Sequence, residues 1–102
     1  GSVINKEIFA NRRAGVDVGE TTEIGNNVKL YQGVTLGALS TRKGQLLADV
    51  KRHPTIGNNV TVYSNASILG GETVVGDNST IGGGAFITSS VPANTRVQVG
   101  AV

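Results

Sequence analysis

A six-residue repeat constrains the fold of this chain more than any other feature. Large aliphatic residues recur every six positions from Val18 to Leu36, and smaller residues such as Val28 and Val34 follow four positions after them. The period resumes at Ile56, and one extra residue near Gly71 shifts it once. The first column is Val18, Ile24, Leu30, Leu36, Ile56, Val62, Ile68, Val75, Ile81 and Ile87, and the second is Val28, Val34, Val60, Ala66, Ser79, Ala85 and Val91. This period fits short strands and does not fit a helix.

The residues between these columns suit tight turns. The triplets GNN at 25–27 and 57–59 and GDN at 76–78 place Gly and Asn where left-handed backbone is tolerated. One hexad is too short to bury its own apolar face, whereas stacked coils bury a continuous column. We therefore predict a single all-β domain of stacked coils over residues 3–102, and we interpret Gly1 and Ser2 as a cloning remnant of recombinant expression.

One segment interrupts the repeat. Residues 38–50, ALSTRKGQLLADV, are polar at their start and lack the six-residue period. We predict a long loop that leaves the coils at one corner. Loops of this length inside a compact domain are usually functional or disordered.

Composition excludes several classes of protein. The chain has no Cys, which removes disulfides and thiolate chemistry, and one His with scattered carboxylates does not predict a metal site. The net charge of +2 and four single aromatic residues do not indicate nucleic-acid binding. No apolar run is long enough to span a membrane.

The motifs resemble one family of hexapeptide-repeat acyltransferases. GVDVGETTEIGNNVKLYQGVTLGA, then a corner loop, then KRHPTIGNNVTVYSNASILGG looks like serine acetyltransferase, and the resemblance covers nearly the whole chain. It implies a left-handed parallel β-helix that assembles as a cytoplasmic homotrimer with active sites between chains. It also implies transfer of an acetyl group from acetyl-CoA to the hydroxyl of L-serine, with a His as general base and an Asp that supports it.

The residues at the family's catalytic position differ. Its Asp-His pair falls on Asn11 and Arg12 in this sequence. Arginine keeps its proton at neutral pH, so Arg12 cannot act as the base. The supporting Asp would lie upstream of Ile4, as would a helical domain of the family. We therefore predict no catalytic residue in this chain, and we interpret Arg12, Arg13 and Asp17 as candidate interface residues.

Two binding sites are implied by the resemblance. Residues matching Arg52 and His53 bind the amino acid's carboxylate in the family, and the planar guanidinium of arginine suits a carboxylate. The alternative, which we favour, is that both residues are partly exposed remnants at the end of the loop. Backbone N–H groups of YSNA and GGGA, here Asn65, Ala66, Gly83 and Gly84, are candidate contacts for the pantetheine arm of CoA, or they serve only turns and coil packing.

Three classes of function follow from these motifs. An ice-binding prism needs a regular ladder of Thr residues on one face, which this sequence lacks. A working serine acetyltransferase needs a base that the sequence does not supply. We therefore predict a catalytically inactive trimeric scaffold, truncated or engineered from a serine-acetyltransferase-like parent. Such a scaffold takes no cofactor, and acetyl-CoA is expected only for the alternative of an active enzyme.

Overall fold

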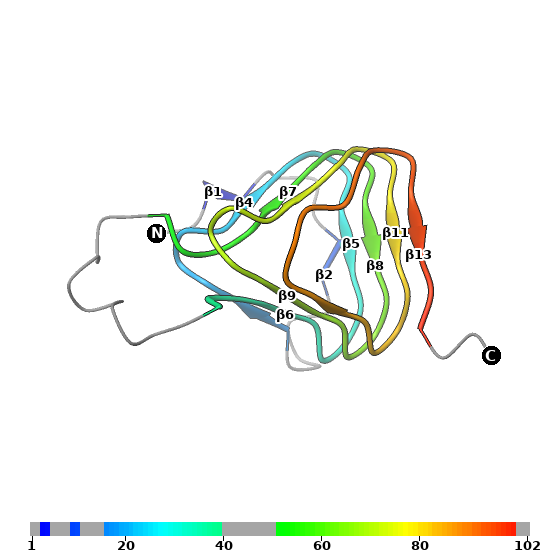
Figure 1. Cartoon of the computed structure of the whole chain (residues 1–102), viewed down its shortest axis with the longest axis horizontal. Coiled ribbons are helices and arrows are strands. Elements are labelled where there is room, and N and C mark those ends of the chain that lie inside the picture. The colour runs from blue at the N-terminus through cyan, green and yellow to red at the C-terminus, as the bar shows by residue number, and fades with distance from the viewer. Residues whose placement is uncertain (1–2, 5–8, 11–15, 40–50, 100–102) are drawn as a thin grey trace.

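The chain folds into a prism with three walls of short parallel strands (Figure 1). The computed structural model describes residues 3–4, 9–10, 16–39 and 51–99, and these residues contain no helix. The first wall holds β1 (Val3–Ile4), β4 (Glu23–Ile24), β7 (Thr55–Ile56) and β10 (Val74–Val75). The second holds β2 (Phe9–Ala10), β5 (Lys29–Leu30), β8 (Thr61–Val62), β11 (Thr80–Ile81) and β13 (Arg96–Val97). The third holds β3 (Asp17–Val18), β6 (Thr35–Gly37), β9 (Ser67–Leu69) and β12 (Phe86–Ile87). The predicted left-handed parallel β-helix is confirmed.

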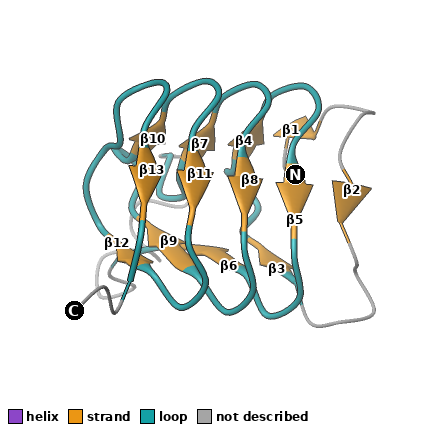
Figure 2. Ribbon diagram, turned by 90° about the vertical axis from the view of Figure 1, so that its right-hand side faces the viewer, coloured by secondary structure: helices purple, strands orange, loops and turns teal. Residues whose placement is uncertain are grey.

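Successive coils keep the register that the repeat predicts (Figure 2). Val18 pairs with Leu36, three hexads later, and Leu36 pairs with Ile68 across the interruption. Ile68 then pairs with Ile87, one residue beyond three hexads, which places the extra residue between these strands as predicted. Each large aliphatic residue therefore stacks on its counterpart in the next coil.

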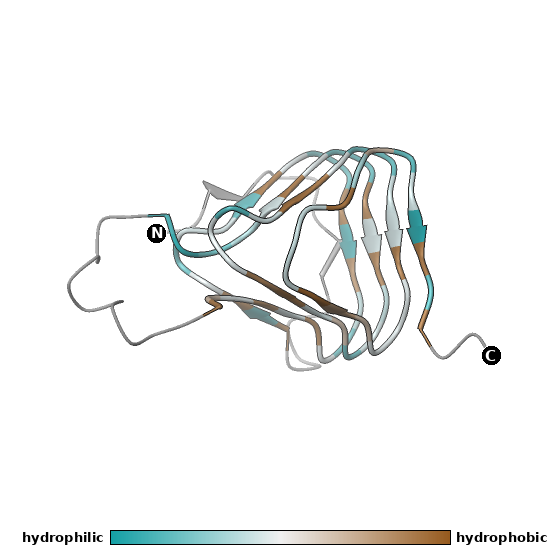
Figure 3. Ribbon diagram, viewed as in Figure 1, coloured by the Kyte–Doolittle hydropathy of each residue, from teal (hydrophilic) through white to brown (hydrophobic). Residues whose placement is uncertain are grey.

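Both predicted columns face the interior of the prism. Their members from Ile24 to Ile81 are buried, and Val18 and Ile87 pack against this core with partial exposure. Hydrophobic segments recur at matching places on neighbouring coils (Figure 3). Burying one such side chain contributes about 1.5–3 kcal/mol, so the stacked column is the main source of stability.

Ser79 is the polar member of the second column. Its hydroxyl bonds to backbone groups of the last coil, which accounts for a polar residue at this buried position. This coil is short, because Val75 pairs with Val91. The Ser79 hydroxyl donates to Pro92 O at 2.9 Å and accepts from Thr95 N–H at 3.3 Å. It therefore satisfies backbone groups of the short coil that a valine at this position would leave without these partners.

The predicted turns are confirmed at one corner of the prism. Asn27, Asn59 and Asn78 have φ values of 58°, 58° and 62°, which is the left-handed region. Asn58 Oδ1 accepts from Asn26 N–H at 2.7 Å, and Asp77 Oδ1 accepts from Asn58 N–H at 2.7 Å. We call these three stacked turns, residues 25–27, 57–59 and 76–78, the asparagine corner. The same chemistry repeats there coil after coil.

The interruption begins at the corner after β6. Ala38 and Leu39 belong to the described residues, whereas 40–50 lie outside them, as do Gly1 and Ser2. Among the residues that the structure does describe, no helix is long and apolar enough to cross a membrane.

Candidate functional site

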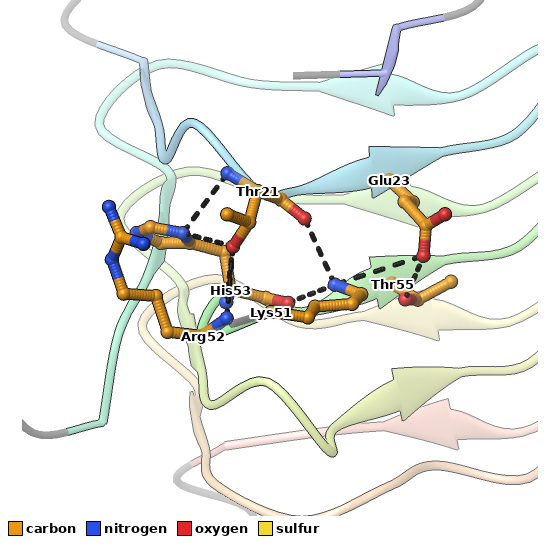
Figure 4. Close-up of polar contacts among 6 residues, drawn as sticks. All are labelled: Thr21, Glu23, Lys51, Arg52, His53 and Thr55. Carbon is orange, nitrogen blue, oxygen red and sulfur yellow. Dashed lines mark hydrogen bonds and ion pairs between the residues drawn. The ribbon is translucent and has the colours of Figure 1, made fainter. Parts of the chain in front are cut away.

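The polar contacts of greatest interest lie where the chain re-enters the prism after the interruption (Figure 4). Thr21 Oγ1 accepts hydrogen bonds from the backbone N–H groups of Arg52 and His53, both at 3.0 Å. The same Oγ1 atom lies 2.6 Å from Nδ1 of His53, and Thr21 N–H donates to that Nδ1 at 3.2 Å. We call this set of contacts among Thr21, Arg52 and His53 the Thr21–His53 clasp. It joins two segments that the long interruption separates in sequence.

Local sequence explains the shape of the clasp. Thr22 N–H donates to Gly19 O at 3.1 Å, which closes a turn that presents Thr21 toward the next coil. The His53 ring lies directly against Gly19, because a Cβ atom at residue 19 would stand 1.9 Å from His53 Cδ2. Pro54 follows and is fully buried, and proline favours an extended conformation in the residue before it. The Gly-Glu-Thr and Arg-His-Pro motifs are therefore two halves of one unit.

Charged side chains surround the clasp. Arg52 Nη2 forms an ion pair with Glu20 Oε1, and Lys51 Nζ lies 3.9 Å from Glu23 Oε2. Lys51 Nζ also donates to the carbonyl oxygens of Thr21, at 3.1 Å, and His53. Thr55 donates its hydroxyl to Glu23 Oε2 at 3.2 Å. These contacts fix both sides of the re-entering chain to the preceding coil.

The surroundings of His53 favour its neutral form. Burial lowers the pKa of His53, and the positive charges of Arg52 and Lys51 lower it further, against the opposing effects of Glu20 and Asp17. Burial also lowers the pKa of Lys51, which the carboxylate of Glu23 partly offsets. At neutral pH the imidazole of His53 is therefore uncharged.

The structure brings together the predicted substrate residues but changes the description of one. His53 is only 9% exposed, so the expectation that it is partly exposed is wrong. The Arg52 side chain is 24% exposed and engages Glu20. The stretch that resembles the family contains Gly-Glu-Thr at residues 19–21, but the sequence alone assigns Thr21 no role. The signal that could have indicated a role for Thr21 is its position one coil before His53, where its hydroxyl faces the ring.

The predicted cofactor residues form a turn ladder. Asn65 and Gly84 have φ values of 63° and 75°, and their N–H groups donate to Gln32 O and Ser64 O, both at 2.9 Å. Ala66 is fully buried and its N–H donates to Tyr63 O at 3.4 Å, so it offers neither its side chain nor its N–H to a ligand. Gly83 is exposed. The role of these residues in turns and coil packing is therefore evident in the structure, and contact with CoA stays a prediction.

A shallow groove of about 250 Å³ lies beside this ladder. Its lining comprises Tyr63, Thr80, Gly82, Arg96, Val97 and Gln98. Tyr31 and Tyr63 stack on neighbouring coils with ring centroids 4.8 Å apart, and the ladder of tyrosines stops where the next coil has Gly82. The groove therefore exists because glycine replaces a ring in that row.

The predicted interface residues are only partly described. Asn11, Arg12 and Arg13 lie outside the described residues. Asp17 is exposed on β3, in the outward-facing position of the strand, as expected for a charge next to the apolar column. Within the described ranges, no three His, Cys, Asp or Glu side chains converge on a point that could hold a metal ion.

Comparison with known proteins finds similar sequences among the serine acetyltransferases. No family model matches the chain. It is 44% identical over 101 residues to a plasmid-encoded serine acetyltransferase of Synechococcus elongatus, covering 96% of this chain and 31% of that protein. It is 43% identical over 95 residues to the serine acetyltransferase of Helicobacter pylori, covering 93% of this chain and 52% of that protein. The chain is a homologue of the serine acetyltransferases. It spans about a third to a half of the length of these relatives.

Solved structures of the family have the same fold. Serine acetyltransferase isoform 3 of Entamoeba histolytica, in complex with cysteine, matches with a TM-score of 0.80 and 37% identity over 93% of this chain and 31% of its own. The Neisseria gonorrhoeae enzyme in complex with serine matches with a TM-score of 0.75 and 36% identity, covering 88% of this chain and 34% of that one. This homologue therefore corresponds to the β-helical part of those longer chains.

Proposed function

We propose that this homologue is a trimeric β-helix scaffold that does not transfer an acetyl group from acetyl-CoA to serine. The observation that carries the proposal is the state of its one imidazole. His53 is the single histidine of the 102 residues, it is 9% exposed, and Thr21 holds its Nδ1 atom. The family's base position is occupied by Arg12, which cannot accept a proton at neutral pH.

The departures from the family's motifs cluster near the start of the chain. Asn11, Arg12 and Asp17 differ from the family pattern, whereas the clasp and most coils after it keep the motifs. The last coil, VQVGAV, lacks the proline of the family's Gly-x-Pro-Ala. This distribution fits a parent of the serine acetyltransferase type whose first coil was redesigned or diverged. The proposed scaffold requires neither acetyl-CoA nor another cofactor.

An active enzyme is the second candidate, and one observation favours it. Thr21 holds the backbone of Arg52 and His53 at the re-entry point, and Glu20 holds the Arg52 side chain, so both residues keep a defined position. Homologues of this chain have been solved in complex with serine and with CoA. On this alternative, Arg52 and His53 would contact the serine, and acetyl-CoA would be the second substrate.

A thiol-release assay separates the two candidates. The protein, its Arg12→His variant and an Asn11→Asp/Arg12→His variant are incubated with acetyl-CoA with and without serine, beside the H. pylori relative as a positive control. General-base catalysis is worth about 10²–10⁴-fold, or roughly 3–5 kcal/mol of barrier, so we expect no serine-dependent release from the unmodified chain. We expect none from Arg12→His alone, because Asn11 still occupies the position of the Asp in the family's Asp-His pair.

Either positive result changes the proposal. Turnover by the unmodified chain makes the scaffold wrong and leaves His53 as the imidazole to test next. Turnover by Arg12→His shows that the Arg12 position alone disables an otherwise competent site. Turnover by the double variant only shows that Asn11 and Arg12 together disable it.

The homotrimer has support from exposed apolar side chains. Phe86 on the third wall is 69% exposed and Leu39 is 58% exposed, and apolar surface of this kind favours association. We expect light scattering coupled to size exclusion to give three times the chain mass of 10.4 kDa. A monomer at micromolar concentration contradicts the trimer and, with it, the interface role of Arg12, Arg13 and Asp17.

A further inference from the structure

We propose that Thr21 is a positioning residue that fixes His53 in the neutral tautomer with its proton on Nε2. The inference rests in part on the proposed function, since it explains why His53 serves as a hydrogen-bond donor and not as a base. It starts from the hydrogen-bonding capacity of a single hydroxyl. A threonine hydroxyl has one proton to donate and two lone pairs to accept with.

Both lone pairs of Thr21 Oγ1 are already engaged. The backbone N–H groups of Arg52 and His53 point at this oxygen from 3.0 Å each. A backbone N–H can only donate, so neither contact can reverse its direction. The one capacity left to Oγ1 is donation of its own proton. The His53 Nδ1 atom, 2.6 Å away, is the acceptor that lies within hydrogen-bond distance.

A second contact imposes the same direction. Thr21 N–H also donates to His53 Nδ1, at 3.2 Å. A proton on Nδ1 would therefore face both the hydroxyl proton and a backbone N–H, with no lone pair to receive it. Because a neutral imidazole carries its proton on one nitrogen and accepts on the other, the proton resides on Nε2.

The packing of the ring prevents an alternative orientation. The His53 ring lies against Gly19, where even a Cβ atom would stand 2.2 Å from Nε2 and 1.9 Å from Cδ2. His53 as a whole residue is 9% exposed and its ring lies against Gly19, so rotation of the ring would require the turn at Gly19 to move. Thr21 and Gly19 together determine both the tautomer and the orientation of the ring.

Full protonation of His53 is opposed by the same groups. An imidazolium would place a proton on Nδ1 against the two Thr21 donors, in addition to the charges of Arg52 and Lys51. Glu20 and Asp17 are the carboxylates that favour the charged form. In this arrangement His53 keeps its proton on Nε2, and it cannot take up a second proton there without first moving its own proton to Nδ1.

Nitrogen-15 NMR tests the tautomer directly. His53 is the only histidine, so labelling histidine nitrogens gives two ring signals that need no further assignment. The chemical shift of each nitrogen reports whether it carries the proton. We expect the unmodified protein at neutral pH to show a protonated Nε2 and an unprotonated Nδ1. A protonated Nδ1, or an even mixture of tautomers, overturns the proposal without any variant.

Variants of Thr21 distinguish control of the His53 tautomer from a purely structural role of Thr21 in the fold. Thr21→Ser keeps the hydroxyl, and we expect it to keep the Nε2–H tautomer. Thr21→Val removes the hydroxyl at nearly constant shape, and we expect a minor Nδ1–H population to appear, because only the backbone N–H of residue 21 then still donates to Nδ1. Thr55→Val is the matched control, because Thr55 bonds to Glu23 instead of to the ring, and it should leave the tautomer unchanged. A folded Thr21→Val protein with a pure Nε2–H tautomer contradicts the role of the Thr21 hydroxyl.

The NMR result is independent of the thiol-release assay. If serine is turned over while His53 carries its proton on Nε2, the scaffold function fails and the positioning role stands. If no turnover occurs and the proton lies on Nδ1, the positioning role fails and the scaffold function stands.

Discussion

Two corners of the same prism are built in opposite ways. At the asparagine corner, three turns repeat Gly, then Asn or Asp, then Asn with a left-handed φ near 60°. The N–H of one turn donates to a side-chain oxygen of the next turn at both junctions between them. The corner that holds the Thr21–His53 clasp has contacts that do not recur, because a threonine, a histidine and a glycine each have a single role. The repeated residues build the coils, and the candidate site lies where the residues do not repeat.

The triplet Gly-Glu-Thr occurs twice and shows why register matters. Residues 19–21 and 71–73 have the same letters, but Thr73 is the structural counterpart of Thr22 and not of Thr21. Thr22 N–H donates to Gly19 O, and Thr73 N–H donates to Gly70 O, both at 3.1 Å. Thr73 is buried and its hydroxyl donates to Leu69 O at 2.7 Å. A shift of one residue in register therefore separates Thr21, which contacts the His53 ring, from Thr73, which closes a turn.

The largest expected effect comes from breaking the clasp corner. Gly19→Ala drives a methyl group into the buried His53 ring, and overpacking of this kind typically costs about 1–3 kcal/mol of unfolding free energy. Urea denaturation at fixed protein concentration measures the loss, which we expect near the upper end of that range. Gly83→Ala is the matched control, because Gly83, like Gly19, has no positive φ and the atom nearest to its new methyl is Ser64 O at 3.2 Å. Equal costs at the two glycines would show that contact with the His53 ring does not decide the effect.

The asparagine corner should tolerate changes that keep its backbone. Asn59→Ala forces a residue with a Cβ to adopt a φ of 58°, which costs about 1–2 kcal/mol. Asn59→Gly also loses the bond from Asn27 Nδ2, at 2.9 Å, but it keeps the conformation. We therefore expect the glycine variant to unfold at a higher urea concentration than the alanine variant. If alanine and glycine are equivalent, the left-handed turn is not what asparagine supplies here.

The smallest expected effect is a pH dependence of the unfolding free energy that originates from His53 in the clasp corner. The pKa of His53 is lowered in the folded protein, so below its ordinary value of 6.5 the unfolded chain binds more protons than the folded one. Stability is therefore greatest above pH 6.5 on this account and falls as the pH drops through 6.5 toward the folded pKa. Urea midpoints between pH 7.5 and about pH 5 measure the slope. If a His53→Gln variant shows the same change of urea midpoint with pH, carboxylates elsewhere cause that change and His53 does not.

The sequence by itself determined the frame of this protein. The aliphatic columns, the strand register and the left-handed asparagines each depend on residues that are close in the chain or one repeat apart. Because burial and turn conformation are dictated by local residue types, a period of six is enough to predict walls, core and corners. The motifs also sufficed to indicate a resemblance to the family and to single out the consecutive residues Arg52 and His53 at the end of the interruption.

Only the tertiary structure decided what surrounds His53. Thr21 and Gly19 lie more than thirty residues before the histidine, as the separation of 32 between Thr21 and His53 shows, and the intervening interruption does not follow the repeat. No local preference reveals that one hydroxyl accepts two backbone N–H groups and therefore has only a proton left for the ring. That assignment depends on three-dimensional distances between coils, because hydrogen-bond direction is fixed by the set of neighbours that share a space.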